Sequence, residues 1–210
     1  HKMKGHYLDT KHPIIMENLL GIKRIKGSNQ KAKKPILIND LRLIINAIDQ
    51  TNQTEKRKIR DKAIILVGFS GGFRRSELVN LKYDDVEFVN EGVKIFIKRS
   101  KTDQSGEGMT KAIPYFDNQL FCPVVSLKNW MNISEIKSGK IFDISDKSIA
   151  LIIKKYASLS GLDPNKYSGH SLRSGFATST AESGAEERNI MAMTGHKTSQ
   201  MVRRYIQEAN

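Results

Sequence analysis

Residues 83–116 are the one segment whose hydrophobic residues do not follow a helical spacing, and this difference constrains the fold more than any other feature. A short apolar stretch at 86–89 is followed by a turn at 90–92, and apolar residues then occupy every second position over 93–97. Alternation of this kind indicates a half-buried strand. A polar loop leads to a third strand around 111–114. Because both connections are local, we expect a three-stranded antiparallel meander.

The rest of the sequence carries apolar residues at the three- and four-residue spacing that is typical of amphipathic helices. Asn39, Thr54 and Asp146 stand where N-terminal caps are expected, and Gly71-Gly72 interrupts a long helix. The predicted fold class is therefore α+β and mainly α, with a small three-stranded antiparallel sheet. We expect helices over residues 13–23, 39–48, 54–70, 74–81, 123–131, 146–161 and 186–193, one that starts at Ser168 or Ser171 and ends near 184, and a last one from about residue 199.

The chain of 210 residues has a formal net charge of +13 and a pI near 9.8. A basic excess of this size favours nucleic acid as a partner, because each neutralised phosphate releases a bound counterion; a basic but unspecialised protein is the alternative. Residues 1–35 contain nine Lys or Arg against Asp9 and Glu17, a net +7. We therefore expect a basic N-terminal arm or linker over residues 1–35 and a globular domain over 36–210. The arm is either simply solvated or a clamp for DNA.

Cysteine content and hydropathy bound the cellular setting. Cys122 is the one cysteine, so neither an intrachain disulfide nor a thiolate zinc site can form, and a reducing, cytoplasmic setting is expected. No apolar run approaches the ~18–20 residues that a membrane span needs. The first residues lack the apolar segment of a secretory signal.

Two motifs place a cation at the start of a helix. His170 and Arg173 are three residues apart, so they share a face of the expected helix, whose N-terminal amides attract anions. Arg74 follows a Gly-Gly break, where a cation opposes the helix dipole unless an anion is held there. Glu77 could reach back and orient the Arg74 guanidinium. Each motif alone is explained as well by a structural histidine or a surface ion pair.

Three further candidate site residues are Lys101, between two expected strands, and His196 and Tyr205, downstream of both motifs. Lys101 falls in a turn between two expected strands, and a flexible ammonium can give a proton to a leaving oxygen. His196 ends a short helix, and Tyr205 comes nine residues later beside Arg203 and Arg204. The alternative interpretations are that Lys101 is simply solvated and that Tyr205 is a packing residue of an amphipathic helix. The tyrosines that compete with Tyr205 are Tyr7, Tyr83, Tyr115, Tyr156 and Tyr167.

Taken together, the order and spacing of these motifs resemble the tyrosine recombinase (phage integrase) family over residues 36–207. The matching segments are Gly-Phe-Arg-Arg-Ser-Glu-Leu at 72–78, His-Ser-Leu-Arg-Ser-Gly at 170–175, Thr-Gly-His-Lys at 194–197 and Arg-Tyr at 204–205. Lys101 falls in the hairpin where the family keeps its lysine. The resemblance implies a DNA transesterification through a 3′-phosphotyrosine intermediate, with no metal and no cofactor.

The resemblance also implies a role for each residue. The catalytic residues would be Arg74, Lys101, His170, Arg173, His196 and Tyr205, with Glu77 supporting Arg74. From the basic charge of the N-terminal arm and of the motifs, we also expect DNA contacts from Lys31, Lys33, Lys34, Arg75, Lys197, Arg203 and Arg204. Residues 36–210 would be the catalytic domain, and 1–35 the remnant of a core-binding domain.

The partner implied by the resemblance is double-stranded DNA. Full-length members work on DNA as tetramers, and the isolated chain could be a monomer. No membrane partner is expected. The long hairpin over residues 100–109 favours an integrase of a mobile element or prophage. Type IB topoisomerase-like relaxation and a non-catalytic DNA-binding relative are the alternatives, and a metal-dependent nuclease is a third, although the motifs offer no clustered carboxylates.

Overall fold

The computed structural model describes residues 9, 11–27, 33–98, 108–196, 198–200, 202–203 and 205. The chain divides into two compact units, His1–Ala32 and Lys33–Asn210. In the first unit, helix α1 (Pro13–Lys26) starts with proline at its first turn, as the fixed φ of proline favours, and ends at Gly27 with φ +68°. Its apolar side chains Ile14, Leu19, Leu20, Ile22 and Ile25 are exposed.

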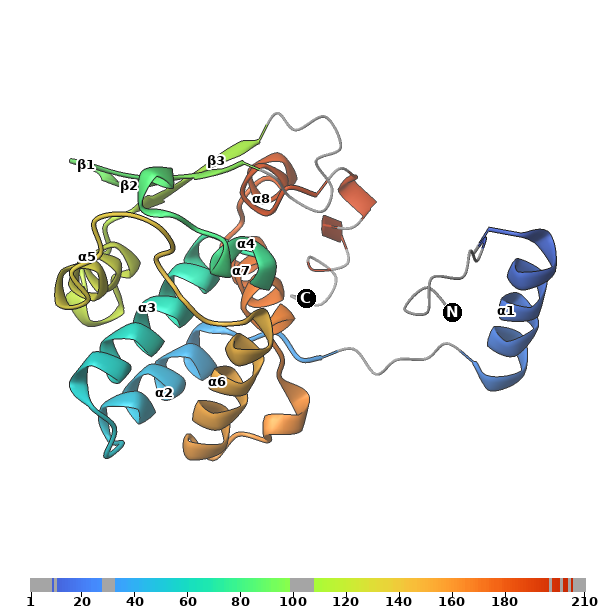
Figure 1. The fold of residues 1–210 in the computed structure, drawn as a ribbon, viewed down its shortest axis with the longest axis horizontal. Helices are drawn as coiled ribbons and strands as arrows, with labels where there is room; N and C mark the ends of the chain where they lie inside the picture. Colours follow the sequence, from blue (N-terminus) through green and yellow to red (C-terminus); the bar gives the residue numbers. More distant parts are fainter. Residues whose placement is uncertain are drawn as a thin grey trace. The chain divides into compact units, whose positions relative to one another are not determined.

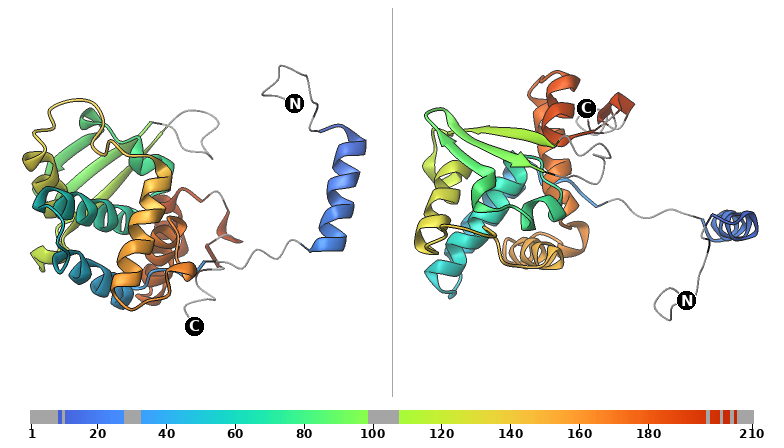
Figure 2. Two further views of the ribbon diagram at one scale, coloured as in Figure 1. Left: turned by 60° about the horizontal axis from the view of Figure 1, so that its bottom comes forward. Right: turned by 45° about the horizontal axis from the view of Figure 1, so that its top comes forward.

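The second unit is a set of helices with a small sheet along one side (Figure 1). The sheet lies over α3 and α5, while α2, α6 and α7 pack around α3 away from the strands (Figure 2). Within the described residues no helix is long and apolar enough to cross a membrane. The helices are α2 (Ile38–Asp49), α3 (Glu55–Ser70), α4 (Arg75–Val79), α5 (Pro123–Ile133), α6 (Asp146–Leu159), α7 (His170–Glu182) and α8 (Glu187–Thr194). Single 3₁₀ turns occur at Tyr83–Asp85, Gln119–Phe121 and Pro164–Lys166.

The sheet has the order β1-β2-β3, formed by Val86–Val89, Gly92–Ile97 and Met109–Pro114, with both pairs antiparallel. Val93 pairs with Ile113, and both are buried, as are Ile95 and Ile97 on the same face. The alternation seen in the sequence thus turns one face of the meander toward the helices. The predicted fold class, mainly α with a three-stranded antiparallel sheet, is confirmed.

Helix α3 is the central element of the unit. Its second half is buried from Ala63 to Ser70, and it ends at Gly71. Gly72 follows with φ +54°, a left-handed conformation that suits glycine, and Phe73 then returns into the core. The turn therefore fixes the direction in which the next residue, Arg74, leaves the core.

Helix α7 lies against α3 and is buried over most of its length although its sequence is polar. A Cβ added at Gly175 would come within 2.0 Å of the Ile36 carbonyl oxygen, so the chain entering α2 passes directly over this glycine. The backbone amide of Ile36 donates to Ser171 O at 3.0 Å. These contacts set the depth at which α7 presents Arg173.

Two predicted caps are wrong by one or two residues. Leu37 and Ser145 are the N-caps of α2 and α6, rather than Asn39 and Asp146. Ser145 is the N-cap of α6 because its hydroxyl accepts a hydrogen bond from the backbone amide of Ser148 at 3.2 Å. Thr54 does occupy the N-cap position of α3.

Candidate active site

Arg74 is the N-cap residue of α4, and Glu77 holds it from two sides. One carboxylate oxygen of Glu77 accepts the Arg74 backbone amide at 2.9 Å, and the other accepts the guanidinium Nη1 at 2.6 Å. Only 2% of the Glu77 side chain is exposed, so this pair is poorly screened by water. The Nη2 atom of Arg74 also lies 3.5 Å from the Gly195 carbonyl oxygen. Glu77 therefore orients the Arg74 guanidinium, as the sequence predicted. Its negative charge also offsets the unfavourable placement of a cation at the N-terminus of a helix.

Arg173 is buried, with 2% of the residue exposed, in the first turn of α7. Its Nη1 donates to Gly72 O at 2.9 Å, and its Nη2 lies 3.1 Å from Nε2 of His196. Burial lowers the pKa of Arg173 to about 10, and the charge of Arg74 adds to this effect. The guanidinium remains charged at neutral pH.

The hydrogen bonds of His196 define its tautomer. A guanidinium has no acceptor, so Nε2 of His196 must accept from Arg173. Its Nδ1 lies 2.8 Å from Oγ1 of Thr194, and that hydroxyl in turn donates to Ile190 O at 2.5 Å. The proton of the neutral ring therefore sits on Nδ1. Burial lowers the pKa of His196 to about 4, with Arg173 and Arg74 contributing, which agrees with a neutral ring.

Tyr205 reaches the same site from the C-terminal segment. Residues 199, 200, 202, 203 and 205 are helical, as predicted for a last helix. The ring of Tyr205 lies 5.7 Å from that of His196, centroid to centroid, with a tilt of 31°. Tyr205 is half-buried and packs with Val202 and Ile190 in a small apolar cluster. Its charge interaction with Arg173 places the phenol within the field of that cation.

His170 opens α7 and is exposed to solvent. Desolvation by the surrounding protein lowers its pKa, and the positive charges of Arg173, Arg74 and Arg75 lower it further. The ring is therefore neutral at pH 7 and able to accept a proton.

Lys111 also belongs to this site, although none of the sequence motifs includes it. It lies on β3 with no exposed surface, and its Nζ donates to Gly71 O at 2.8 Å and to Met193 O. The ammonium also lies 5.0 Å from the centroid of the Phe73 ring. Lys111 thus connects the turn before Arg74 with the end of α8. The signal was present, because the two-residue period of β3 puts position 111 on the same buried face as Ile113.

Burial lowers the pKa of Lys111 to about 7. The carboxylate of Glu77 opposes this effect, whereas the charges of Arg173 and Arg74 add to it. Four groups of the site, Lys111, Arg173, His196 and His170, therefore have lowered pKa values, and neighbouring cations contribute to each. A cluster of cations around one carboxylate is arranged to receive an anion.

The structure brings Arg74, Glu77, Arg173, His196 and Tyr205 together, with His170 within their electrostatic reach. Four of the expected residues, Lys31, Lys101, Lys197 and Arg204, lie outside the described residues.

The described residues on the expected DNA-contact list have partners within the protein. The Nζ of Lys33 donates to Asn165 O at 2.6 Å, and Lys34 pairs with Asp40 at 3.1 Å. Arg75 lies 4.0 Å from Asp146, and Nε of Arg203 donates to Glu187 at 3.1 Å.

Comparison with known proteins agrees with the geometry. The phage integrase family profile matches residues 36–210, and the chain belongs to this family. An integrase/recombinase XerD homolog from Selenomonas ruminantium is 42% identical over 218 residues, covering 98% of this chain and 63% of that protein. A tyrosine recombinase from Agathobacter rectalis is 32% identical over 163 residues, covering 76% of this chain and 51% of that protein. The chain thus spans less than two thirds of the length of these relatives.

Solved structures share the fold. The XerH site-specific recombinase, in a post-cleavage complex with its palindromic difH substrate, superposes with a TM-score of 0.72 at 20% identity, covering 88% of this chain and 53% of that one. The Tn1549 transposon integrase in complex with transposon right-end DNA superposes with a TM-score of 0.62 at 16% identity, covering 88% and 64% of the two chains.

Proposed function

We propose that this chain carries the catalytic domain of a site-specific DNA recombinase, an integrase of a mobile element or prophage. The observation that supports this most directly is the convergence of Arg74, Arg173, His196 and Tyr205, which come from four separate segments. Two guanidiniums beside a phenol suit a phosphodiester, because planar forks grip its non-bridging oxygens. Each such preorganised donor is worth ~3–4 kcal/mol in the transition state.

In the proposed reaction the Tyr205 oxygen bonds to the scissile phosphorus while the bond from phosphorus to the 5′-oxygen breaks. His170 takes the phenol proton, since free tyrosine has a pKa of about 10 and is a weak nucleophile at neutral pH. Lys101 gives a proton to the leaving 5′-oxygen. A second 5′-hydroxyl then attacks the phosphotyrosine and reverses each step, so the ester conserves the bond energy.

The hydrogen bonds of His196 would have to change when a phosphate binds. Its Nε2 accepts from Arg173 in this structure. We infer that a phosphate bound between the guanidiniums takes over the Arg173 contact. His196 then donates to that phosphate from Nε2, either as the doubly protonated ring, which the negative charge of the phosphate favours, or as the neutral tautomer whose Nδ1 accepts from the Thr194 hydroxyl.

We also propose that duplex DNA is the partner, that the full-length protein assembles as a tetramer on two duplexes, and that it acts in the cytoplasm. Residues 1–35 would belong to an arm that clamps the DNA. Their net charge of +7 supports this assignment.

The test is covalent trapping on a nicked suicide duplex that carries the ends of the protein's own element. Tyr205→Phe should abolish the protein–DNA adduct and leave DNA binding intact, and Tyr167→Phe serves as the control that keeps the adduct. An adduct that persists in Tyr205→Phe would assign the nucleophile to another residue. Adduct formation that needs a divalent cation would instead favour a metal-dependent enzyme.

The role of Lys101 has its own test. Lys101→Ala should slow cleavage of the normal substrate and recover on a duplex with a 5′-thio leaving group, which needs no proton. Absence of recovery would remove Lys101 from this role. Relaxation of supercoils without strand exchange would favour the topoisomerase alternative.

A further inference from the structure

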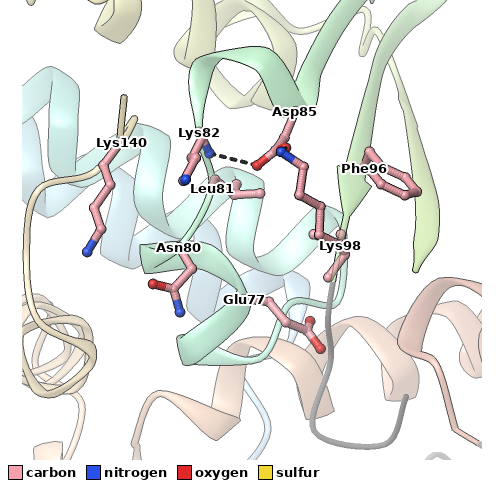
Figure 3. A pocket seen from close by; sticks show the side chains of 9 residues that line it. Glu77, Asn80, Leu81, Lys82, Asp85, Phe96, Lys98 and Lys140 are labelled. Atoms are coloured by element: carbon pink, nitrogen blue, oxygen red, sulfur yellow. Dashed lines mark hydrogen bonds and ion pairs between the residues drawn. The ribbon is translucent and has the colours of Figure 1, made fainter. Parts of the chain in front are cut away.

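A basic hollow of about 470 Å³ lies beside the candidate active site, between the end of α4 and strand β2 (Figure 3). Glu77 belongs to both places, since it holds Arg74 and also forms part of the wall of the hollow. The other lining residues are Asn80, Leu81, Lys82, Asp85, Phe96, Ile97, Lys98 and Lys140.

Two of the lysines are placed side by side by the backbone. Lys82 and Lys140 form an isolated antiparallel bridge, closed by hydrogen bonds from Tyr83 N to Gly139 O at 2.8 Å and from Ile141 N to Leu81 O at 2.9 Å. Leu81 and Ile141 are buried. Because neighbouring side chains in an extended segment point to opposite faces, the two lysines point outward together, as Figure 3 shows.

Directly opposed like charges destabilise a strand pair. The two carboxylates of the hollow do not relieve this repulsion. Asp85 pairs with Lys98 at 2.8 Å and accepts the Lys82 backbone amide at 3.0 Å, while Glu77 is engaged by Arg74. Within the described part of the chain, neither the Lys82 nor the Lys140 ammonium has a carboxylate partner within 4.0 Å. Among the described residues, the hollow therefore has two exposed cations without a carboxylate partner.

We propose that this hollow binds a backbone phosphate of duplex DNA that neighbours the scissile phosphate at Arg74; this inference rests on the proposed function. Arg74 and Lys82 are eight residues apart and are joined by the short helix α4. Successive nucleotides advance ~3.4 Å along the duplex axis per strand, so a strand held at Arg74 has other phosphates nearby. The pair Lys82–Lys140 would grip one of them.

The chemistry of the hollow favours phosphate contact over base reading. Lysine carries a flexible point charge. It lacks the planar guanidinium of arginine, which makes two parallel hydrogen bonds to a base edge or a carboxylate. A contact of this kind positions the duplex and carries no sequence information. It would therefore fix the register of the strand at the active site for any target sequence.

The test measures how DNA affinity depends on salt. The double variant Lys82→Gln/Lys140→Gln should bind a duplex of arbitrary sequence more weakly, and the slope of log K against log salt should decrease in magnitude by about 1, because each lost phosphate contact removes ~0.9. Fluorescence anisotropy over a salt series gives both quantities. Circular dichroism and thermal unfolding confirm that the exposed substitutions leave the fold unchanged.

The matched control is Lys56→Gln/Arg57→Gln, which also removes two exposed positive charges. These residues lie in the first turn of α3, at the end of that helix far from Arg74. The control should keep the slope of the unmodified protein. An unchanged slope in Lys82→Gln/Lys140→Gln, or an equal decrease in the control, would overturn the proposal. Adduct formation by the unmodified protein tests the recombinase function separately, so the two failures are distinguishable.

Discussion

Replacement of Lys111 by methionine tests how the buried cation of the site is stabilised. Methionine preserves the length and apolar stem of the side chain and removes the ammonium. The carbonyl oxygens of Gly71 and Met193 then lose their donor, at ~1–3 kcal/mol each. The substitution also removes the desolvation of a charge that has no exposed surface. Because these effects oppose each other at neutral pH, their pH dependence is the informative quantity.

The magnitude follows from the pKa of Lys111, which falls from 10.5 to about 7 on folding. Each pH unit of that difference is worth ~1.4 kcal/mol, so the whole effect is roughly 5 kcal/mol. Between pH 7 and 10.5 the unfolded chain keeps the proton that the folded chain releases. The unfolded state binds more protons there, so the contribution of Lys111 to stability rises with pH. Between pH 7 and 9 the rise is ~2 kcal/mol.

Urea unfolding at pH 7, 8 and 9 measures this difference. The free energy of unfolding of the unmodified protein, minus that of Lys111→Met, should increase with pH by about 2 kcal/mol over this range. Lys94→Met is the control, since Lys94 lies exposed on the neighbouring strand β2 and its difference should stay flat. A flat difference for Lys111→Met as well would show that the two carbonyls keep the ammonium charged and outweigh desolvation.

Three other substitutions address the contacts of the site. Arg173→Lys should lower the rate of adduct formation by ~10²–10³, because a point charge cannot replace a planar fork that stabilises the transition state; single-turnover trapping measures this. Glu77→Gln should slow adduct formation by up to about 100-fold through misplacement of Arg74 while DNA affinity changes little; equal losses in rate and affinity would contradict a purely orienting role. Thr194→Val leaves Nδ1–H of His196 without its acceptor and should destabilise the fold by ~1–3 kcal/mol in urea unfolding; an unchanged stability would show that this hydrogen bond contributes nothing to the fold.

The sequence predicts the meander and most helices because their signals are local. The turn at residues 90–92 and the alternation over 93–97 need no distant partner, and β2 forms as they predict. The start of α5 at Pro123 and the end of α3 at Gly71 also follow from single residues with restricted or unusual backbone freedom.

The contacts of the site could not be predicted in the same way. The bond between Arg173 and His196 joins positions 23 residues apart, and that between Arg173 and Gly72 spans 101. Both depend on how α7 packs against α3, which no local pattern encodes. Lys33 and Lys34 illustrate the same limit, because no local pattern reveals the partners that the fold gives both ammonium groups within the chain; their contact with DNA stays a prediction.

The arrangement of the site explains how several cations can be gathered without a bound anion. Each one binds a backbone carbonyl of another segment: Arg173 binds Gly72, Arg74 lies near Gly195, and Lys111 binds Gly71 and Met193.

Among the described residues of the site, these carbonyls supply partial negative charge without a second buried carboxylate that would compete with a phosphate. The remaining repulsion contributes to the lowered pKa values of Arg173, His196 and Lys111. A bound phosphate would reverse that contribution, because an anion beside the cations raises each of these pKa values again. In the proposed reaction, the free energy stored as repulsion in the free protein would be recovered when the DNA phosphate binds, and most fully in the transition state, where the negative charge on the phosphate is greatest.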